Sequence, residues 1–512
     1  MGVKAMGKKL GNAVGAVIKE KVFWFCVVVA AGVLAVCTKS SFLYPLNDWV
    51  DSNCFYTVGK SMVHGKVLYR DIYEQKGPLL YIIHAAGYLI SPGSFTGVYC
   101  LEVLAATAFL YSTWLILKEY CGWAVVLTLP ILAALVYSAP SFSYGDSAEE
   151  FCVPAYALCM LVSFRALLKN QEVSPGGLFL AGAMGACVLW IKYTMLGFFV
   201  GWFIVPTVVA VCHGGLKRFF RSLAWVLTGV LAVSLPILLY FAVNGALNEL
   251  WQVYFYDNMF LYADVQVSET QTLMQKLGTI VDTAWTSVKL TFSRNIQYAV
   301  LTELGLIWIL LKEKWSLKIH IVTVLVFTCL TVYGGGRGYV YYGFILAVFA
   351  FIGLIPICSI LRHVPVKAVI LKVCCAVTGV VSLVMAYSIS ENVYLMSYEK
   401  EDMPQYQFAE IINQKEDATL LNYGFLDGGF YTAADIVPST RFFCYLNIPL
   451  DEIMDTQREI VANGEVDFVV TRAYPIRSEN YECVAESSMF FAGEIYDYYL
   501  FQLKSTKREE KK

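Results

Sequence analysis

Long apolar runs recur along this chain, and they constrain its fold more than any other feature. Of its 512 residues, 58% are hydrophobic and 15% are charged, whereas soluble domains average ~45–50% apolar and ~25% charged residues. About 20 helical residues cross a hydrocarbon layer of ~30 Å. The candidate spans are 22–38, 95–117, 123–137, 152–168, 178–191, 196–212, 224–243, 297–311, 319–333, 341–357 and 369–390. The sequence therefore predicts a polytopic α-helical membrane protein with about eleven transmembrane helices.

Basic residues gather in the loops that follow alternate spans. They are Lys118; Arg165 and Lys169; Lys217, Arg218 and Arg221; Lys312, Lys314 and Lys318; and Arg362, Lys367 and Lys372. Cytoplasmic loops carry an excess of Lys and Arg, so this alternation predicts a multi-pass protein of the cell membrane with a cytoplasmic N-terminus. The first apolar run is expected to be an uncleaved helix. No basic domain indicates a nucleic-acid partner.

The composition changes after residue 390. The predicted domains are a transmembrane domain at 1–390, whose first external loop is 39–78, and a small extracytoplasmic α/β domain at 391–512. In the second domain the predicted strands are 418–423, 441–446, 466–471 and 498–503, around a helix at 450–462. Cys444 and Cys483 belong to this domain and could pair if that side of the membrane is oxidising.

The first external loop is far more polar than a simple connection between two membrane helices requires. Residues 45–79 hold Asp48, Asp51, Lys60, His64, Lys66, Arg70, Asp71, Glu74 and Lys76 between two apolar runs. This concentration of acids and bases predicts the floor of an active site on a membrane surface.

Local signals place two of these residues. Asp51 is a suitable N-cap, and Phe55, Val58 and Met62 follow with helical spacing up to Gly65, which predicts a short interfacial helix. Lys76 precedes a Gly-Pro bend where the chain returns to the bilayer. Taken singly, these two positions are better explained by a capping role for Asp51 and a headgroup contact for Lys76.

The pattern D-S-x-x-F-x-x-x-G-K-x-x-x-x-G-x-x-x-Y-R-D-x-x-x-x-K-G-P-L over 51–79 resembles a known family. It is similar to the first external loop of GT-C type integral-membrane glycosyltransferases, in particular bacterial members related to protein O-mannosyltransferases and lipid A aminoarabinose transferases. The resemblance implies an enzyme that takes a sugar from a polyprenyl-phosphate carrier and places it on an external acceptor. A hexosyl- or pentosyltransferase with an inverting mechanism is expected.

The resemblance also implies roles for individual residues. Asp51 matches the acidic first-loop position, which acts as a base or orients the acceptor, and Lys76 matches the lysine that meets the carrier phosphate. Glu149 and Glu150 fall near the acidic residue of the second external loop. Two departures are Ser52, where many relatives have a second acid, and Tyr341, where bacterial members have a histidine.

The residue types suit this chemistry in their own right. A carboxylate can draw the proton from an acceptor hydroxyl, and fixed cations can stabilise the departing phosphate. Asp48 is a further candidate acid, and Arg70, Arg337 and Lys192 are further candidate phosphate ligands, arginine offering two donors to phosphate oxygens. A divalent metal such as Mg²⁺ or Mn²⁺, held by Asp51 with Asp146, Glu149 or Glu150, is a possible cofactor. Glu102 and Glu303 lie inside predicted spans, where a carboxylate usually faces a cavity or a partner.

The preferred function is thus transfer of a sugar from a polyprenyl-phosphate-linked donor to an acceptor hydroxyl of a cell-envelope glycan, lipid or protein. Two other classes stay open. A transporter or lipid-carrier flippase would have charges midway through its spans and two related halves. A polymer-binding scaffold would work mainly through the C-terminal domain.

Overall fold

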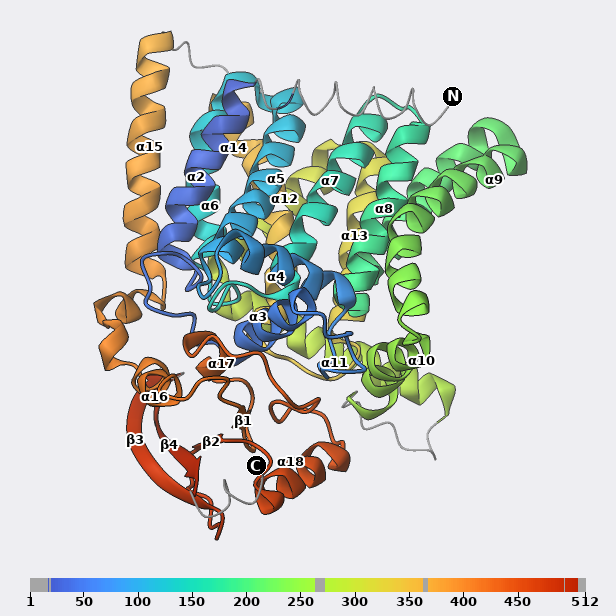
Figure 1. Cartoon of the computed structure of the whole chain (residues 1–512). Coiled ribbons are helices and arrows are strands. Elements are labelled where there is room, and N and C mark those ends of the chain that lie inside the picture. The colour runs from blue at the N-terminus through green and yellow to red at the C-terminus, as the bar shows by residue number, and fades with distance from the viewer. Residues whose placement is uncertain (1–16, 18–19, 263–271, 362–366, 492, 505–512) are drawn as a thin grey trace. The chain divides into compact units, whose positions relative to one another are not determined.

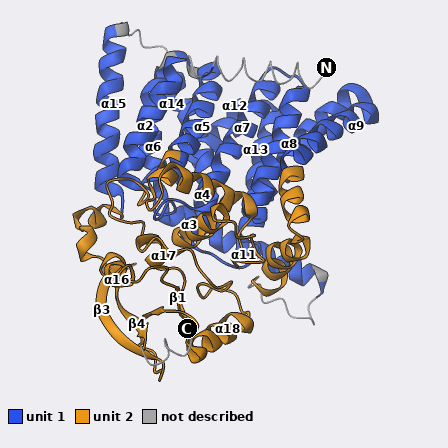
Figure 2. Cartoon of the chain, viewed as in Figure 1, with its two compact units in different colours: residues 1–37, 101–233, 266–391 blue, residues 38–100, 234–265, 392–512 orange. Residues whose placement is uncertain are grey.

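The computed structural model describes residues 17, 20–262, 272–361, 367–491 and 493–504 of the chain (Figure 1). These residues form two compact units, each assembled from three separated segments (Figure 2). The first lies within 1–37, 101–233 and 266–391, and the second within 38–100, 234–265 and 392–512. The C-terminal segment is therefore grouped with the first polar loop.

The first unit consists of packed apolar helices. Its elements are α2 (Lys21–Cys37), most of α5 (Thr96–Cys121), η1 (Gly122–Ala124), α6 (Val125–Tyr137), α7 (Ala148–Leu168), α8 (Pro175–Lys192), η2 (Tyr193–Leu196), most of α9 (Gly197–Val243), α11 (Leu273–Arg294), α12 (Ile296–Lys312), α13 (Trp315–Tyr333), η4 (Val340–Gly353), α14 (Leu354–Leu361) and α15 (Ala368–Ile389). Among the described residues, six helices are long and apolar enough to cross a membrane. The polytopic helical class is confirmed, and the number of crossings stays a prediction.

Two features shape this helical unit. Helix α9 bends sharply at Gly214 and Gly215, and Gly215 has a φ of 63°, in the left-handed region that glycine tolerates. The bend lies in the basic loop that the sequence predicts between the spans 196–212 and 224–243. Elsewhere η4, a 3-10 helix of 14 residues, packs closely on α12, because a Cβ at Gly353 would lie 2.1 Å from the carbonyl oxygen of Leu301.

The second unit begins with two short helices, α3 (Val50–Val63) and α4 (Pro78–Ile90). The predicted interfacial helix is present and ends two residues before Gly65, whose φ is 87°. Its N-cap is Trp49, with Asp51 in the first turn, so the prediction that Asp51 caps the helix is wrong. The extended backbone of Trp49 sets the start of the helix two residues earlier than an Asp51 cap would.

The second of the three chain segments in this unit, 234–265, contains the short helices α10 (Leu247–Glu249) and η3 (Leu250–Leu261). Residues 250–261 form a π-helix. This conformation is rare in proteins, and where it occurs it is often at a functional site.

The C-terminal segment contains a four-stranded sheet. After η5 (Val393–Ser397), η6 (Lys400–Asp402) and α16 (Pro404–Ile412) come β1 (Leu420–Asn422), α17 (Phe430–Ala433), α18 (Asp451–Asn463), β2 (Phe468–Arg472), β3 (Tyr481–Phe491) and β4 (Glu494–Leu503). The strand order is β1-β2-β4-β3, with β1 parallel to β2 and the other pairs antiparallel.

One face of this sheet packs against α18. Ile460 and Val461 of the helix share a core with Leu421, Val469 and Phe501 of three strands. Helix α18 ends at Gly464, whose φ of 65° forms a left-handed cap. The predicted helix at 450–462 and the predicted strands at 418–423, 466–471 and 498–503 thus correspond to elements of the structure.

The predicted strand at 441–446 is absent, and the strand β3 was missed. Residues 441–446 are irregular although mostly buried. Their backbone groups form isolated hydrogen bonds and not a strand ladder; for example, the Tyr445 N–H donates to the Phe425 carbonyl at 2.9 Å. Strand β3 was not predicted, because its polar residues interrupt the alternation of apolar and polar side chains that is typical of a strand. Cys444 lies beside Cys54, with 3.8 Å between the Sγ atoms, and Cys483 is an exposed free thiol on β3.

Helices α3 and α4 pack too closely at Gly59 for a side chain. A Cβ there would lie 2.6 Å from the amide nitrogen of Ala85 and 2.7 Å from the carbonyl carbon of His84. We expect Gly59→Ala to lower the free energy of unfolding by ~1–3 kcal/mol, as overpacking does. Thermal unfolding of the purified protein in detergent measures this.

Gly278 is the matched control, because it is exposed in α11 and an added Cβ meets nothing within 4 Å. Gly278→Ala should be neutral or stabilising by up to ~1 kcal/mol through helix propensity. Equal unfolding temperatures for the two variants would contradict the close packing of α3 on α4.

Candidate functional site

Asp51, Glu74 and Lys76 form a small charged cluster in the second unit. The Lys76 backbone N–H donates to Glu74 Oε2 at 3.0 Å and to the Tyr81 hydroxyl at 2.8 Å. Lys76 Nζ lies 5.9 Å from the centre of the Phe55 ring, and Phe55 follows Asp51 by one helical turn on the same face of α3. The structure therefore brings the predicted acid and the predicted phosphate ligand to one place.

Glu74 is the residue that the sequence reasoning missed in this cluster. It is buried, and burial raises the pKa of its carboxyl group. The Lys76 ammonium lowers this pKa and the Asp51 carboxylate raises it, because a nearby opposite charge favours the ionised form and a like charge disfavours it. A signal was present, since Glu74 is the acid nearest to Lys76 along the chain.

The bend that carries Lys76 is held by its own backbone. Gly77 has the extended φ of −74° and ψ of 148° expected before Pro78. The Tyr69 hydroxyl donates to the Lys76 carbonyl at 2.5 Å. Lys76 is thus held at both its N–H and its carbonyl, and its side chain projects from a fixed position.

The π-helix supports one side of this loop. The Tyr73 hydroxyl donates to Asp257 Oδ2 at 2.8 Å, and Gln252 Nε2 donates to Asp257 Oδ1 at 2.8 Å. The side-chain amide of Asn258 also donates to the Gln75 carbonyl at 2.6 Å. The adjacent residues Asp257 and Asn258 are therefore tied to Tyr73 and Gln75, the two residues that flank Glu74.

The C-terminal segment supports the same loop through Arg441. The Tyr73 N–H donates to the Arg441 carbonyl at 3.0 Å, and Arg441 Nε donates to the Tyr69 carbonyl at 3.1 Å. The guanidinium carbon also lies 5.3 Å from the centre of the Tyr73 ring. Both supports come from distant parts of the sequence, so neither could be predicted from the loop itself.

The two other candidates of the first loop have partners of their own. Asp48 forms an ion pair of 2.7 Å with Lys39, and both side chains are almost fully buried. Burial lowers the pKa of Lys39 and the Asp48 carboxylate opposes that change. Arg70 is exposed, pairs with Asp71 at 2.8 Å and donates to the Asn244 carbonyl at 2.9 Å.

The face of α3 away from Asp51 is fixed to the C-terminal segment by buried polar contacts. The Thr57 hydroxyl donates to Asp427 Oδ2 at 2.6 Å, and Lys60 Nζ donates to the Tyr431 carbonyl at 2.9 Å. Burial raises the pKa of the Asp427 carboxyl group to about 6. This network holds the helix on which Asp51 stands.

In the first unit, a second acidic cluster forms where α7 begins. The Ser147 hydroxyl accepts the Glu150 N–H at 3.1 Å as an N-cap. The Asp146 N–H donates to Glu150 Oε2 and to Glu102 Oε1, each at 2.9 Å. Asp146 has a φ of 60°, and these two acceptors hold its unusual backbone conformation.

The remaining candidates of the first unit are joined by aromatic rings. Glu149 and Lys192 form a short ion pair, and Lys192 Nζ lies 3.5 Å from the centre of the Tyr342 ring. Arg337 donates to the Tyr339 hydroxyl at 3.3 Å, and Tyr339 stacks on Tyr341 with 5.7 Å between ring centres. Tyr341 occupies the position where the family pattern has histidine.

The candidates thus divide between the two units, with Asp48, Asp51, Arg70 and Lys76 in one and Asp146, Glu149, Glu150, Lys192 and Arg337 in the other. Among the described residues, no group of three or more His, Cys, Asp or Glu side chains could hold a metal ion. The predicted metal ligands Asp51 and Asp146 belong to different units.

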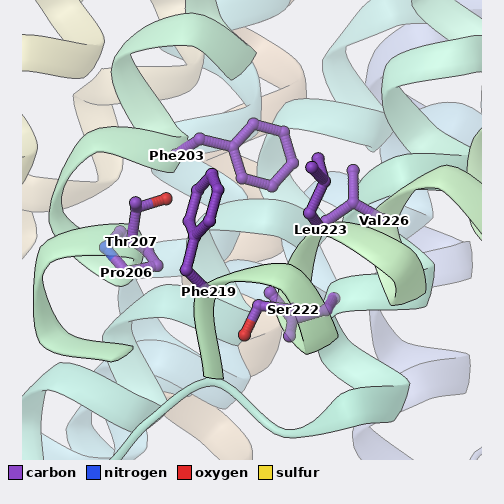
Figure 3. Close-up of a pocket in the computed structure, with 8 residues that line it drawn as sticks. Phe203, Pro206, Thr207, Phe219, Ser222, Leu223 and Val226 are labelled. Atoms are coloured by element: carbon purple, nitrogen blue, oxygen red, sulfur yellow. The ribbon is translucent and has the colours of Figure 1, made fainter. Parts of the chain in front are cut away.

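Two cavities of the first unit are lined mainly by apolar side chains. One of about 880 Å³ lies among α11, α12 and α13, with Lys289 and Glu303 in its wall. The other, of about 290 Å³, lies between α8 and the two arms of α9, where Phe203 and Phe219 face each other (Figure 3). Glu303, which the sequence places inside a span, thus faces a cavity, and the other charged candidates described above do not line either one.

Comparison with known proteins identifies the fold. No family model and no curated protein matches this chain. The crystal structure of ArnT from Cupriavidus metallidurans bound to undecaprenyl phosphate matches it with a TM-score of 0.59 at 12% identity, over 93% of this chain and 97% of that one. The apo structure of the same ArnT gives a TM-score of 0.50 at 12% identity, over 97% and 99%. The predicted GT-C-like fold is thereby confirmed.

The buried Asp427 carboxyl group makes stability depend on pH. Its pKa is about 6 in the folded protein and ~3.9 in an unfolded chain. A raised carboxyl pKa contributes stability that is fully present below pH ~4 and is lost as the pH rises through about 6. We expect the free energy of unfolding of Asp427→Asn to lack this decrease between pH 4 and 7.

The measurement is thermal unfolding of both proteins across this pH range. Asn can keep the contacts, since its oxygen can accept from Asn422 and Gly429 while its amide donates to Thr57. Asp455→Asn, on the exposed face of α18, is the control and should follow the wild-type curve. Parallel curves for wild type and Asp427→Asn would overturn the assignment.

Proposed function

We propose that this protein is a membrane glycosyltransferase that moves a sugar from a polyprenyl-phosphate carrier to an acceptor hydroxyl. The observation that carries the proposal is that Lys76 lies beside Asp51 and Glu74. The loop that holds them is hydrogen-bonded to the 250–261 segment and to Arg441. The fold supports it, because ArnT, a lipid A aminoarabinose transferase, has been solved with undecaprenyl phosphate bound. The motif over 51–79 resembles the GT-C type in the same region.

Asp51 is the proposed base. It takes the proton of the acceptor hydroxyl while the acceptor oxygen forms a bond to the anomeric carbon of the sugar. The bond from that carbon to the carrier phosphate breaks, and its electron pair leaves with the phosphate. A single displacement of this kind inverts the anomeric centre. General-base catalysis contributes ~10²–10⁴-fold to rate.

Lys76 is the proposed ligand of the carrier phosphate. An ammonium held at a fixed bend needs no reorganisation when negative charge develops on the leaving group, which is how preorganised charges stabilise a transition state. Glu74 is the buried neighbour of Asp51 and Lys76: burial raises its carboxyl pKa, the Lys76 ammonium lowers it and the Asp51 carboxylate raises it. Its side chain still accepts the Lys76 N–H and so positions the lysine.

The other candidates receive revised proposals. Asp48 and Lys39 form a buried pair that orders the start of the loop. Glu150 and Glu102 hold Asp146, and Glu149 holds Lys192, so these acids organise the 141–150 loop rather than exchange protons. Arg337 remains a proposed phosphate ligand in the tyrosine-rich 339–342 segment. Arg70 is a weaker one, because its guanidinium already pairs with Asp71.

Asp51→Asn tests the proposed base. The amide cannot accept the acceptor proton, so we expect sugar transfer to fall by at least ~10²-fold with unchanged amounts of protein in the membrane. The assay is mass spectrometry of cell-envelope polymers from a deletion strain that carries each variant. Asp455→Asn is the control and should restore the wild-type polymer.

A polymer restored to wild-type level by Asp51→Asn would overturn the assigned role. The flippase alternative is separated by the same strains. A flippase would alter the distribution of the carrier across the membrane without a covalent change in the polymer.

Lys76→Ala tests the phosphate ligand. A hydrogen bond to a charged group contributes ~1.5–3 kcal/mol, so we expect the affinity for undecaprenyl phosphate to fall by ~10–100-fold. Native mass spectrometry of the purified protein with undecaprenyl phosphate measures this. Lys66→Ala removes a lysine of the same loop and should leave the affinity within about twofold. Equal affinities for the two variants would count against Lys76.

A further inference from the structure

The β3–β4 hairpin ends in exposed apolar side chains. Phe490 and Ile495 are directly paired across the two strands, so they project from the same face of the hairpin. Phe490 is 40% exposed and Ile495 is 73% exposed. Between them the chain turns at Gly493, whose φ is 94°. A pair of large apolar groups at the end of a hairpin is unfavourable in water.

The same tip contacts two residues that follow membrane helices in the sequence. The Phe490 ring is perpendicular to the Tyr394 ring, with 5.7 Å between centres. Lys39 Nζ lies 5.9 Å from the centre of the Phe491 ring and donates to the Tyr394 hydroxyl at 3.1 Å. Tyr394 comes five residues after Ile389, the end of α15, and Lys39 comes two residues after Cys37, the end of α2.

Chain length limits how far Lys39 can lie from the bilayer. Two residues reach at most ~7 Å. Helix α2 has 17 residues, and at 1.5 Å per residue it is ~25 Å long, shorter than a hydrocarbon layer of ~30 Å. The apolar sequence of α2 predicts a membrane helix, and the two-residue connection keeps Lys39 within ~7 Å of its end at Cys37. The hairpin tip contacts Lys39, so it is tied to the same helix end.

Neighbouring residues give the same indication. Phe42 and Leu43, just after Lys39, are 64% and 42% exposed. Aromatic and apolar side chains at this depth are typical of groups that lie in the membrane interface. Exposed apolar side chains thus occur both next to Lys39 in the sequence and on the hairpin that contacts Lys39.

We propose that the tip of the β3–β4 hairpin inserts Phe490 and Ile495 into the headgroup–acyl boundary of the bilayer. The C-terminal sheet is then held on the membrane by lipid contacts as well as by the protein contacts described above. The partner is the phospholipid surface itself, recognised by apolar burial rather than by one headgroup.

Site-specific photocrosslinking tests this. Ile495 and Glu482 are each replaced, in separate variants, by p-benzoyl-phenylalanine in the full-length protein. Glu482 is the matched control, because it is exposed on strand β3 and lies eight residues, ~26 Å along the strand, from Phe490, the cross-strand partner of Ile495. Each protein is placed in nanodiscs of phosphatidylcholine and phosphatidylglycerol, irradiated, and examined by mass spectrometry for covalent lipid adducts.

The expected result is a lipid adduct at position 495 with several-fold higher yield than at position 482. Equal yields at the two positions, or an adduct at 495 with a second protein chain in place of lipid, would overturn the proposal. If the Ile495 variant does not accumulate, the same substitution of Phe490 provides the second position. Lipid adducts at 490 and their absence at 482 would support the proposal equally.

Discussion

Hydrocarbon offers no hydrogen-bond partner to a peptide group, and this constraint determines most of the structure. Each apolar segment must satisfy its own N–H and C=O groups, which a helix does. The first unit accordingly consists of apolar helices that approach each other at glycines, as α12 and η4 do at Gly353. The chain departs from the helix at Gly214 and Gly215, next to the basic residues 217, 218 and 221, where headgroups and water can replace the missing partners.

In the second unit, buried charged and polar groups are paired with other groups of the protein. Lys39 pairs with Asp48, Lys60 donates to the Tyr431 carbonyl, and Glu74 accepts the Lys76 N–H. An unpaired buried charge is strongly destabilising, so each of these contacts fixes a segment relative to the others within the unit. The C-terminal segment is for this reason a structural part of the loop that carries Lys76, through Arg441 and Asp427, and not an appended module.

This arrangement also explains how two acids and a lysine can have separate roles. Burial and the neighbouring Asp51 charge both raise the carboxyl pKa of Glu74. The Lys76 ammonium opposes this shift, as an opposite charge does. The loop that holds the cluster contacts a π-helix on one side and Arg441 on the other, which keeps these groups in fixed positions.

The sequence by itself determined the class of the protein and the location of its polar chemistry. Apolar runs predict helices, and the run at 369–390 became α15 at Ala368–Ile389, because a helix in lipid depends only on its own residues. It also indicated Asp51 and Lys76 within one loop. Only the tertiary structure decided that Glu74 joins them, that Asp48 is committed to Lys39, that Cys444 lies beside Cys54, and that the polar strand β3 completes the sheet. Those contacts join residues as many as 390 positions apart, and no local periodicity records a partner at that separation.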